Sequence, residues 1–291
     1  MAARTNRDRL LTVAVGGEIA PAVFGTNPYD IAADGRAIIV PGMGSVNLNV
    51  RVGDPALGWA ADHVEPAVSA RAKDDRENVG FCLLSCVGNR ATVMSGESKG
   101  ATGVVTGKHG GIEHVMIDFP GDVLERLAVG DKIAVRAVGQ GLALNDLPSV
   151  RLFNMDPDFF ERLNCEIAGD RLRVPVAKTV PAAVMGSGLG RDNVYRGDYD
   201  IQMFSPDIVE QYGLASIRLG DIVAIIDAEH SYGRIYKTGA VSIGVVVHGA
   251  SVIAGHGPGV SSLMTSGDGK IEPVLDPKAN LADILALRED A

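Results

Sequence analysis

The chain has 291 residues, of which 46% are hydrophobic and 22% are charged, so it can bury a substantial core in one large domain or two closely packed ones. Its formal net charge is −9 at pH 7, and an acidic chain repels phosphate backbones and anionic lipid, which argues against nucleic-acid and membrane partners. The longest apolar runs, 222–226 and 241–247, have the length of strands and are too short to span a bilayer.

Short strands are the main element that the sequence predicts. Glycine accounts for 36 residues, and it is interleaved with β-branched residues instead of being gathered in linkers. This pattern is typical of many short strands joined by tight turns. In chain order, the predicted strands cover residues 13–15, 37–40, 46–52, 133–138, 222–226 and 241–247.

Helical patterns are few and short. They cover residues 122–127, 156–164, 206–212 and 280–288, the last with Asn280 as N-cap. We therefore expect a β-dominated α+β fold, with short strands in barrel- or sandwich-like sheets and a few short helices. Residues 1–291 should form one compact unit or two interlocked halves, 1–150 and 151–291.

Two pairs of segments resemble each other. Gly130-Asp131 and Gly220-Asp221 each lead into a predicted strand. Lys99 and Lys237 each begin a segment with a Gly-Ala step and a valine-rich strand, which ends in His109-Gly and His248-Gly respectively. Related β-units would place these two histidines at comparable sheet edges, and chance similarity between glycine- and valine-rich segments is the alternative.

Five of the six histidines lie in or beside glycine-rich segments, where the backbone can turn sharply and approach a ligand. We expect these histidines to converge on one pocket. The turn Gly110-Gly111 can bring His109 and His114 together, and neutral imidazole is the commonest metal ligand. The candidate ligands of a divalent metal (zinc, manganese or iron) are His109, His114 and His248. The alternative for each is a hydrogen-bonded histidine that closes a loop.

The candidate catalytic residues centre on the segment that follows predicted strand 222–226. A carboxylate beside an imidazole is the usual acid–base pairing, because each tunes the pKa of the other toward neutrality. The candidates are His230, Asp227, Glu229, Glu113 and Lys99. The alternatives are a solvated polar turn for the 227–230 segment and an ordinary surface charge for Lys99.

Candidate substrate-binding residues lie in three loops. The 59–66 segment sets ionisable side chains beside the only tryptophan, which can wall a pocket or simply anchor a polar loop. The 230–236 loop is crowded with tyrosine and arginine, and the 254–259 loop can form a backbone nest for a carboxylate. The candidates are Trp59, His63, Glu65, Lys108, Tyr232, Arg234, His256 and Gly257.

Cysteine usage and the N-terminal segment bear on the compartment. Cys82, Cys86 and Cys165 form no metal-binding or redox spacing, and their number is odd. We expect buried thiols in a reducing compartment. The apolar stretch 10–15 is too short for the core of a signal peptide, so a cytoplasmic protein is expected.

Several motifs together resemble a bacterial and archaeal family, the domain of unknown function 4438, over nearly the whole chain. They are Asn47-Leu-Asn-Val-Arg-Val-Gly-Asp54, Gly58-Trp-x-x-Asp-His-Val-Glu-Pro66, Ser95-Gly-Glu-Ser-Lys-Gly100, Thr106-Gly-Lys-His-Gly-Gly-Ile-Glu-His-Val115, Asp227-x-x-His-x-Tyr-Gly-Arg234 and Ala254-Gly-His-Gly-Pro-Gly259. This resemblance implies no particular reaction. Residues 220–230 also resemble a segment of the acetamidase/formamidase enzymes, which implies β-rich, metal-dependent amide hydrolysis, although the Gly-Asp-Gly-Glu that follows in those enzymes is absent.

The function expected from these residues is hydrolysis of a C–N bond in a small or cyclic amide, with water activated by a metal or a His–carboxylate pair. A lyase or isomerase can use the same groups, and a non-catalytic small-molecule or metal-binding protein is a third possibility. We also expect a homo-oligomer, because strand 241–247 is apolar on both faces and few helices are available to cover it. The alternative is that the chain's own sheets bury it.

Overall fold

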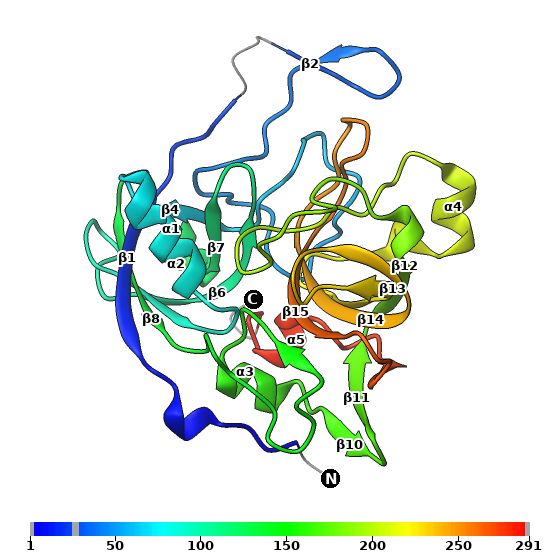
Figure 1. Ribbon diagram of the computed structural model, residues 1–291. Coiled ribbons are helices and arrows are strands. Elements are labelled where there is room, and N and C mark those ends of the chain that lie inside the picture. Colours follow the sequence, from blue (N-terminus) through cyan, green and yellow to red (C-terminus); the bar gives the residue numbers. More distant parts are fainter. Residues whose placement is uncertain (1–2, 25–28, 289–291) are drawn as a thin grey trace.

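Six antiparallel strands of the N-terminal half close into a barrel in the computed structural model, which describes residues 3–24 and 29–288 (Figure 1). The strand order around the barrel is β1-β4-β7-β6-β5-β8. These strands are β1 (Val13–Ile19), β4 (Val68–Arg71), β5 (Arg90–Val93), β6 (Thr102–His109), β7 (His114–Asp118) and β8 (Lys132–Ala137). Closure leaves no open sheet edge, and one cluster of buried hydrophobic side chains fills the barrel.

A five-stranded sheet, in the order β12-β13-β14-β15-β9, dominates the C-terminal half. Its strands are β9 (Arg151–Leu152), β12 (Lys178–Pro181), β13 (Ile222–Glu229), β14 (Ile235–His248) and β15 (Gly259–Ser266). β12 runs parallel to β13, and the other pairs are antiparallel. Two smaller sheets complete the strands, one of β10 (Glu166–Ala168), β11 (Arg171–Val176) and β16 (Ile271–Leu275), the other of β2 (Asp30–Ile31) and β3 (Ala37–Ile38).

The helices are short. They are α1 (Asp75–Leu84), α2 (Gly121–Leu124), α3 (Pro157–Arg162), α4 (Pro206–Gln211) and α5 (Leu281–Ile284), with 3-10 turns η1 (Arg7–Arg9), η2 (Ala182–Val184) and η3 (Leu214–Ser216). None of the helices within residues 3–24 and 29–288 is long and apolar enough to cross a membrane. The fold class is therefore the β-dominated one that the sequence predicts.

Residues 240–248 of strand β14 are covered on both faces by their own chain. Val245 and Val247 belong to the core on one face of the sheet, and Val246 belongs to the core on the other. The same alternation holds along β13, where Ile222 and Val223 point to opposite cores. Since each such side chain contributes roughly 1.5–3 kcal/mol when fully buried, this doubly covered sheet is a major source of stability. No second subunit is needed to bury it.

Some element boundaries differ from those expected. Segment 46–52 is not a strand: only a bridge from Val46 to Val68 forms, because the Asn47 side chain accepts hydrogen bonds from the backbone amides of Asn49 and Val50 and turns the chain. Helix α1 was not predicted, because its residues show no clear apolar period. Asn280 does cap α5, accepting from the amide of Ala282 at 2.8 Å.

The two Gly-Asp segments form the same turn. Gly130 and Gly220 both have positive φ, 89° and 85°, which glycine tolerates best. The next residue, Asp131 or Asp221, accepts a hydrogen bond from the backbone amide three residues before it, at 3.0 and 2.8 Å respectively. The resemblance between these segments therefore has a common structural basis.

Candidate metal centre

The barrel and the five-stranded sheet meet where β6 and β14 end. A Cβ on Gly107 of β6 would lie 2.2 Å from Cγ1 of Val247 of β14, so glycine allows the two strands to approach closely. The last residues of these strands are His109 and His248, and their ring centroids are 4.1 Å apart. The two histidines that end similar sequence segments are therefore neighbours in space.

Two aspartates reach the same point from the extended segment 198–200. Asp198 Oδ2 lies 2.6 Å from Nε2 of His248, and Asp200 Oδ1 lies 3.7 Å from the same nitrogen. The backbone amide of Gly110 donates to Asp198 Oδ1 at 2.7 Å. Gly197 makes this possible, because a Cβ there would lie 2.6 Å from Cα of Gly110. Tight glycine packing thus fixes the Asp198 carboxylate beside both strand ends.

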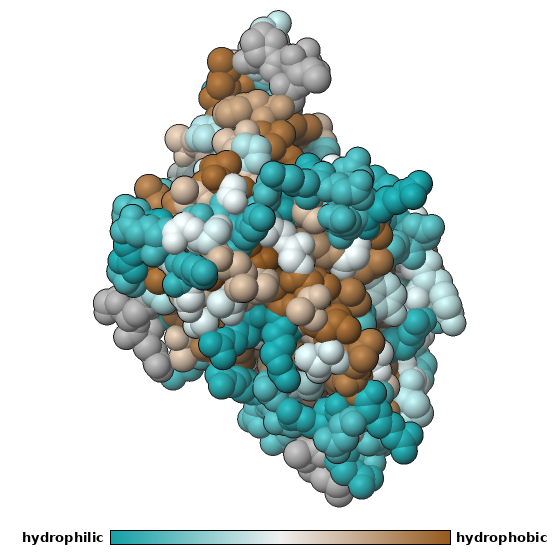
Figure 2. Space-filling view, turned by 90° about the vertical axis from the view of Figure 1, so that its left-hand side faces the viewer, coloured by the Kyte–Doolittle hydropathy of each residue, from teal (hydrophilic) through white to brown (hydrophobic). Residues whose placement is uncertain are grey.

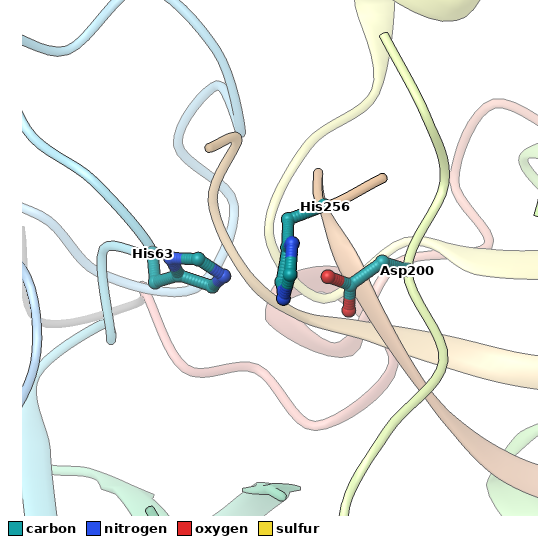
Figure 3. Close-up of side chains that lie close together, drawn as sticks. All are labelled: His63, Asp200 and His256. Carbon is teal, nitrogen blue, oxygen red and sulfur yellow. The ribbon is translucent and has the colours of Figure 1, made fainter. Parts of the chain in front are cut away.

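The side chains form two groups of three, each with candidate ligand atoms within 4.8 Å of one another. The inner cluster is His109, Asp198 and His248, all buried. The outer cluster is His63, Asp200 and His256, of which His256 is half-buried. In Figure 3 the His63 ring and the Asp200 carboxylate approach the His256 ring from opposite sides. The His63 ring lies 5.1 Å from that of His248, so the clusters adjoin.

Carboxylates orient one histidine of each cluster. His109 Nδ1 donates to Glu65 Oε1 at 2.7 Å, and His63 Nδ1 donates to Asp62 Oδ2 at 2.5 Å. A carboxylate on one ring nitrogen fixes the tautomer and leaves Nε2 as a lone-pair donor, which is the usual arrangement behind a metal-bound histidine.

Backbone carbonyls orient the other two histidines. His248 Nδ1 donates to the carbonyl of Gly249 at 2.9 Å, and His256 Nδ1 donates to that of Ala254 at 3.2 Å. With Nδ1 already protonated, Nε2 of His248 can face Asp198 only as the second N–H of an imidazolium or as a lone pair that shares a cation with the carboxylate. In all four histidines Nε2 is therefore the ring nitrogen that can bind a metal, and in His248 it faces the Asp198 carboxylate.

Glu65 lies behind the inner cluster and links it to the barrel. Besides His109, it accepts hydrogen bonds from His114 Nδ1 at 2.9 Å, from Ser69 Oγ at 2.5 Å and from the amide of Gly44 at 2.6 Å. Burial alone would raise the pKa of Glu65, but the bonds from the two histidines outweigh burial and hold that pKa well below its usual range. Glu65 is therefore a fixed anion.

The two aspartates differ in protonation. Burial and the nearby Asp198 carboxylate together raise the pKa of Asp200 to about 8, against the opposing effect of His248. Burial would also raise the pKa of Asp198, but His248 and His109 hold it below its usual range. Ionising both carboxylates in one buried site costs free energy because the two negative charges repel each other. A bound cation would offset this repulsion.

A cavity of about 640 Å³ opens over both clusters. Members of each cluster line it, and three arginines contribute to its wall: Arg191, Arg196 and Arg234. Glu113 also lines it, with its carboxylate 2.9 Å from Arg196. This volume is in the range of small-molecule sites.

Two of the three predicted metal ligands belong to a cluster, and the third does not. His109 and His248 belong to the inner cluster. His114 pairs with His109 across the β6–β7 turn and shares Glu65 with it, but His114 is fully buried and does not line the cavity. Its Nε2 has no hydrogen-bond partner among the described residues.

Four of the predicted substrate-binding residues lie at or beside the clusters. His63 and His256 are in the outer cluster, Arg234 lines the cavity, and the amide of Gly257 donates to Asp200 Oδ2 at 3.4 Å. Glu65, by contrast, is 1% exposed and cannot touch a substrate.

The acidic residues of the 227–230 segment turn away from the cavity. Asp227 Oδ1 accepts from the amide of Gly239 at 2.7 Å, and Glu229 Oε1 accepts from the amide of Ser231 at 2.8 Å. Both therefore stabilise turns around the β13–β14 connection, although Glu229 is buried and not solvated.

His230 is close to the cavity but does not line it. Its Nδ1 lies 2.9 Å from Ser262 Oγ, and its ring packs edge-on against Tyr199, with centroids 5.6 Å apart. Burial, with the charge of Arg234, lowers the pKa of His230 to about 3, so the ring is neutral.

Three other predicted residues lie elsewhere. Lys99 is exposed on a turn, and Tyr232 is 87% exposed beneath the guanidinium of Arg151. Trp59 donates its Nε1 to the carbonyl of Pro55 and packs against a core cluster. None of them lines the cavity.

Lys108 is a buried tether and not a cavity residue. Its Nζ donates to Asn154 Oδ1 and to the carbonyl of Tyr195, both at 2.8 Å. Burial lowers its pKa to about 8. Because Tyr195 lies just before the 198–200 segment, Lys108 helps to hold Asp198 next to β6.

The sequence analysis missed Asp198 and Asp200 as site residues. A usable signal was present, because Asp-Tyr-Asp after Gly197 places both carboxylates on one side of an extended chain. Asp62 was seen beside His63 but was not assigned a role. Arg191 and Arg196 were missed as well, and exposed arginines in loops carry no distinctive pattern.

Comparison with known proteins gives two family-model matches and one solved structure. Residues 29–161 match the model described as "Domain of unknown function (DUF4438), N-terminal", and residues 162–285 match its C-terminal counterpart. A structure titled "Crystal structure of TM1086" is similar at 49% sequence identity and a TM-score of 0.93, covering 97% of this chain and 99% of that one. No curated protein matches the chain.

Proposed function

The chain belongs to the DUF4438 family, and we propose that it is a metal-dependent hydrolase that cleaves a C–N bond in a small or cyclic amide. One observation carries the metal part of this proposal. All four histidines of the two clusters donate Nδ1 to a fixed acceptor, so Nε2 is the ring nitrogen that can bind a metal, and in His248 this nitrogen lies 2.6 Å from the candidate ligand Asp198.

The donor set favours zinc, manganese or iron. Two imidazoles and one carboxylate in each cluster are the ligand types that these ions accept, and three protein ligands leave a position open for water or substrate. Two such clusters side by side suit a pair of ions. A divalent ion there would lower the pKa of a bound water and polarise the amide carbonyl.

The cavity supplies the remaining parts of a hydrolytic site. Its volume of about 640 Å³ suits a small molecule. Glu113 also lines it, and its ion pair with Arg196 positions the carboxylate. We assign Glu113 as the group that carries a proton to the departing amine. His230, Asp227, Glu229 and Lys99 have no reacting role in this proposal.

Metal analysis of the purified full-length chain, followed by an activity screen, tests the proposal. We expect about two equivalents of zinc, manganese or iron per chain, with release of amine or ammonia from linear amides or ring opening of cyclic ones, and we expect this hydrolysis to stop on chelation. A chain that binds none of these ions at micromolar concentration contradicts the proposal. Bound metal with solvent-deuterium exchange into substrate carbon, but no hydrolysis, assigns the site to a lyase or isomerase instead.

We also propose a homo-oligomer. The arm that carries β2 and β3 rises from the body, and hydrophobic side chains gather on it (Figure 2). Tyr29, Ile31 and Ile39 are 50%, 55% and 71% exposed, which is unusual for residues of this size on one short arm. Light scattering should give at least twice the chain mass, and a mass near 30.4 kDa at micromolar concentration contradicts this proposal.

We propose a cytoplasmic location as well. Cys82, Cys86 and Cys165 are all free and buried, and burial raises their thiol pKa values to about 11, 11 and 12. Such thiols are inert core residues, as expected in a reducing compartment. Fractionation of the native host would test the location, and recovery outside the cytoplasm would contradict it.

A further inference from the structure

Arg234 is buried without an ionic partner. It is 1% exposed and is among the largest fully buried side chains. Its Nη1 makes one long hydrogen bond of 3.5 Å to the carbonyl of Gly188, while its Nε and Nη2 have no partner among the described residues. Its guanidinium carbon lies 5.8 Å from the ring of Tyr199. A buried guanidinium with most of its donors unpaired is costly, and an anion is the partner that would remove this cost.

The unpaired donors of Arg234 belong to a residue of the cavity wall. Arg234 lines the cavity together with Gly188, Asp198 and Asp200. Neither aspartate forms an ion pair with it within the described chain, although both attract it at longer range. Burial lowers the pKa of Arg234, which is the expected sign for a cation that lacks a close counter-ion.

The loop 186–191 holds Arg234 rigidly from the other side. The amide of Gly190 donates to the carbonyl of Arg234 at 2.9 Å, and the amide of Arg234 donates to that of Arg191 at 3.0 Å. Gly188 has a φ of 89°, and a Cβ there would lie 2.6 Å from the carbonyl oxygen of Asp198. These contacts fix the backbone of Arg234 against the loop, and the guanidinium lies beside Gly188 of that loop.

A second unpaired donor or acceptor lies nearby. His230 Nε2 is buried and has no partner among the described residues, and its ring packs against Tyr199. The positive charge of Arg234 is felt at His230, where it lowers the pKa. Arg234 therefore leaves hydrogen-bonding capacity unused in the part of the cavity that it lines, and His230, which does not line the cavity, leaves more close by.

The chemistry of this space favours a carboxylate over a phosphate. A guanidinium fork matches the two oxygens of a carboxylate. A phosphate dianion would suffer more repulsion from the Asp198 carboxylate, which lines the same cavity, and only one of the cavity's arginines is deeply buried. A single negative charge is the better match for a single buried cation.

We infer that the substrate is a small amide that also bears a carboxylate, and that Arg234, with His230 beside it, binds that carboxylate next to the metal clusters. This inference rests on the proposed hydrolase function for the amide, and on Arg234 alone for the carboxylate. The clusters would then hold the amide end of the molecule while Arg234 sets its orientation.

Calorimetric binding of N-acetylglycine and of its uncharged analogue N-acetylglycinamide to the full-length chain tests the inference. Both measurements are made on zinc-loaded protein and again after chelation. We expect the acid to bind about tenfold more tightly or better, the scale of a charge-assisted hydrogen bond in a buried site. This preference should persist without metal. Equal binding of the two compounds overturns the inference, as does a preference that disappears on chelation, since the carboxylate would then be a metal ligand. Displacement of N-acetylglycine by millimolar inorganic phosphate overturns the choice of carboxylate.

Matched variants locate the effect. Arg234→Gln should reduce the preference below about twofold, while Arg191→Gln, which removes an exposed arginine from the same cavity, should retain most of it. The reverse pattern overturns the inference. If Arg234→Gln fails to fold, Arg234→Lys keeps the charge but not the fork and should lose most of the preference. Metal content of the same samples separates the two proposals. If the wild-type protein takes up no metal but still prefers the acid, the result contradicts the hydrolase proposal and supports the carboxylate site.

Discussion

The inner and outer clusters have the same composition, two histidines and one aspartate, but different supports. His109 and His248 of the inner cluster end two long strands of different sheets, and all three of its residues are buried. The three residues of the outer cluster all come from segments between strands, and His256 is half-buried. A ligand set fixed on strands loses little conformational freedom on binding, whereas a loop-borne set loses more. We therefore expect the inner cluster to bind its ion more tightly and the outer one to exchange ions and meet substrate.

Replacing Asp198 should have the largest effect on this comparison. Asp198→Asn preserves the shape of the side chain but removes the negative charge beside His248 Nε2. Metal analysis should show loss of the inner ion, and amide hydrolysis should fall to background because the more rigid site is gone. Retention of two ions per chain would show that the inner cluster is not a metal site.

A steric change beside the inner cluster should have the second-largest effect. In Gly259→Ala the new Cβ would lie 2.0 Å from Asp198 Oδ2 and 2.2 Å from His248 Nε2, so both side chains must move. We expect a loss of about 1–3 kcal/mol in the free energy of unfolding, together with loss of the inner ion. Gly80→Ala in α1, where a Cβ meets nothing within 4 Å, is the matched control: it should raise the free energy of unfolding by about 0.5–1 kcal/mol, because alanine is the better helix former, and should leave the inner ion in place. Denaturant titration and metal analysis of both variants measure the difference.

Replacing Glu65, the carboxylate behind the inner cluster, should reduce metal binding less than replacing a residue of that cluster. Glu65→Gln weakens the orientation of His109 without touching the ion, which typically costs about 10–100-fold in metal affinity. Competition with a chelating dye would measure this change. Asp62→Asn, the equivalent change behind His63 in the outer cluster, should leave the tighter affinity unchanged. An equal loss of the tighter site in both variants would remove the distinction between the clusters.

The smallest effect is expected for the half-buried histidine. His256→Ala removes one outer ligand, so one ion per chain should remain and the free energy of unfolding should change little. Residual hydrolysis with a raised KM would fit a loop-borne site that contacts substrate. Loss of both ions in this variant would mean that the clusters act as one unit.

The same contrast explains which features the sequence could predict. Strands β8, β13 and β14 are rich in valine and isoleucine, and His109 and His248 could be placed at strand ends from local pattern alone. Asp198 and Asp200 could not, because their proximity depends on contacts such as that between Gly110 and Gly197, which lie far apart along the chain. The 46–52 segment looked like a strand, yet one asparagine side chain redirected it.

The candidate catalytic residues of the 227–230 segment illustrate a further limit. A strand that ends in Asp, Glu and His has the composition of a site, but the two carboxylates accept bonds from nearby backbone amides instead of facing the cavity. Composition near a strand end predicts polarity well. The direction of each side chain depends on the turn that follows, and Asp227 takes a positive φ that the sequence does not signal.

The close approach of β6 and β14 at Gly107 and Val247 has a thermodynamic consequence. Because His109 belongs to the barrel and His248 to the five-stranded sheet, an ion in the inner cluster would cross-link the two halves of the chain. By linkage, its binding free energy would add to the cohesion of that junction, by about 4 kcal/mol at a free ion concentration a thousand times its Kd. Folding and ion binding would then be coupled, and the chain would reach its full free energy of unfolding only with the ion bound.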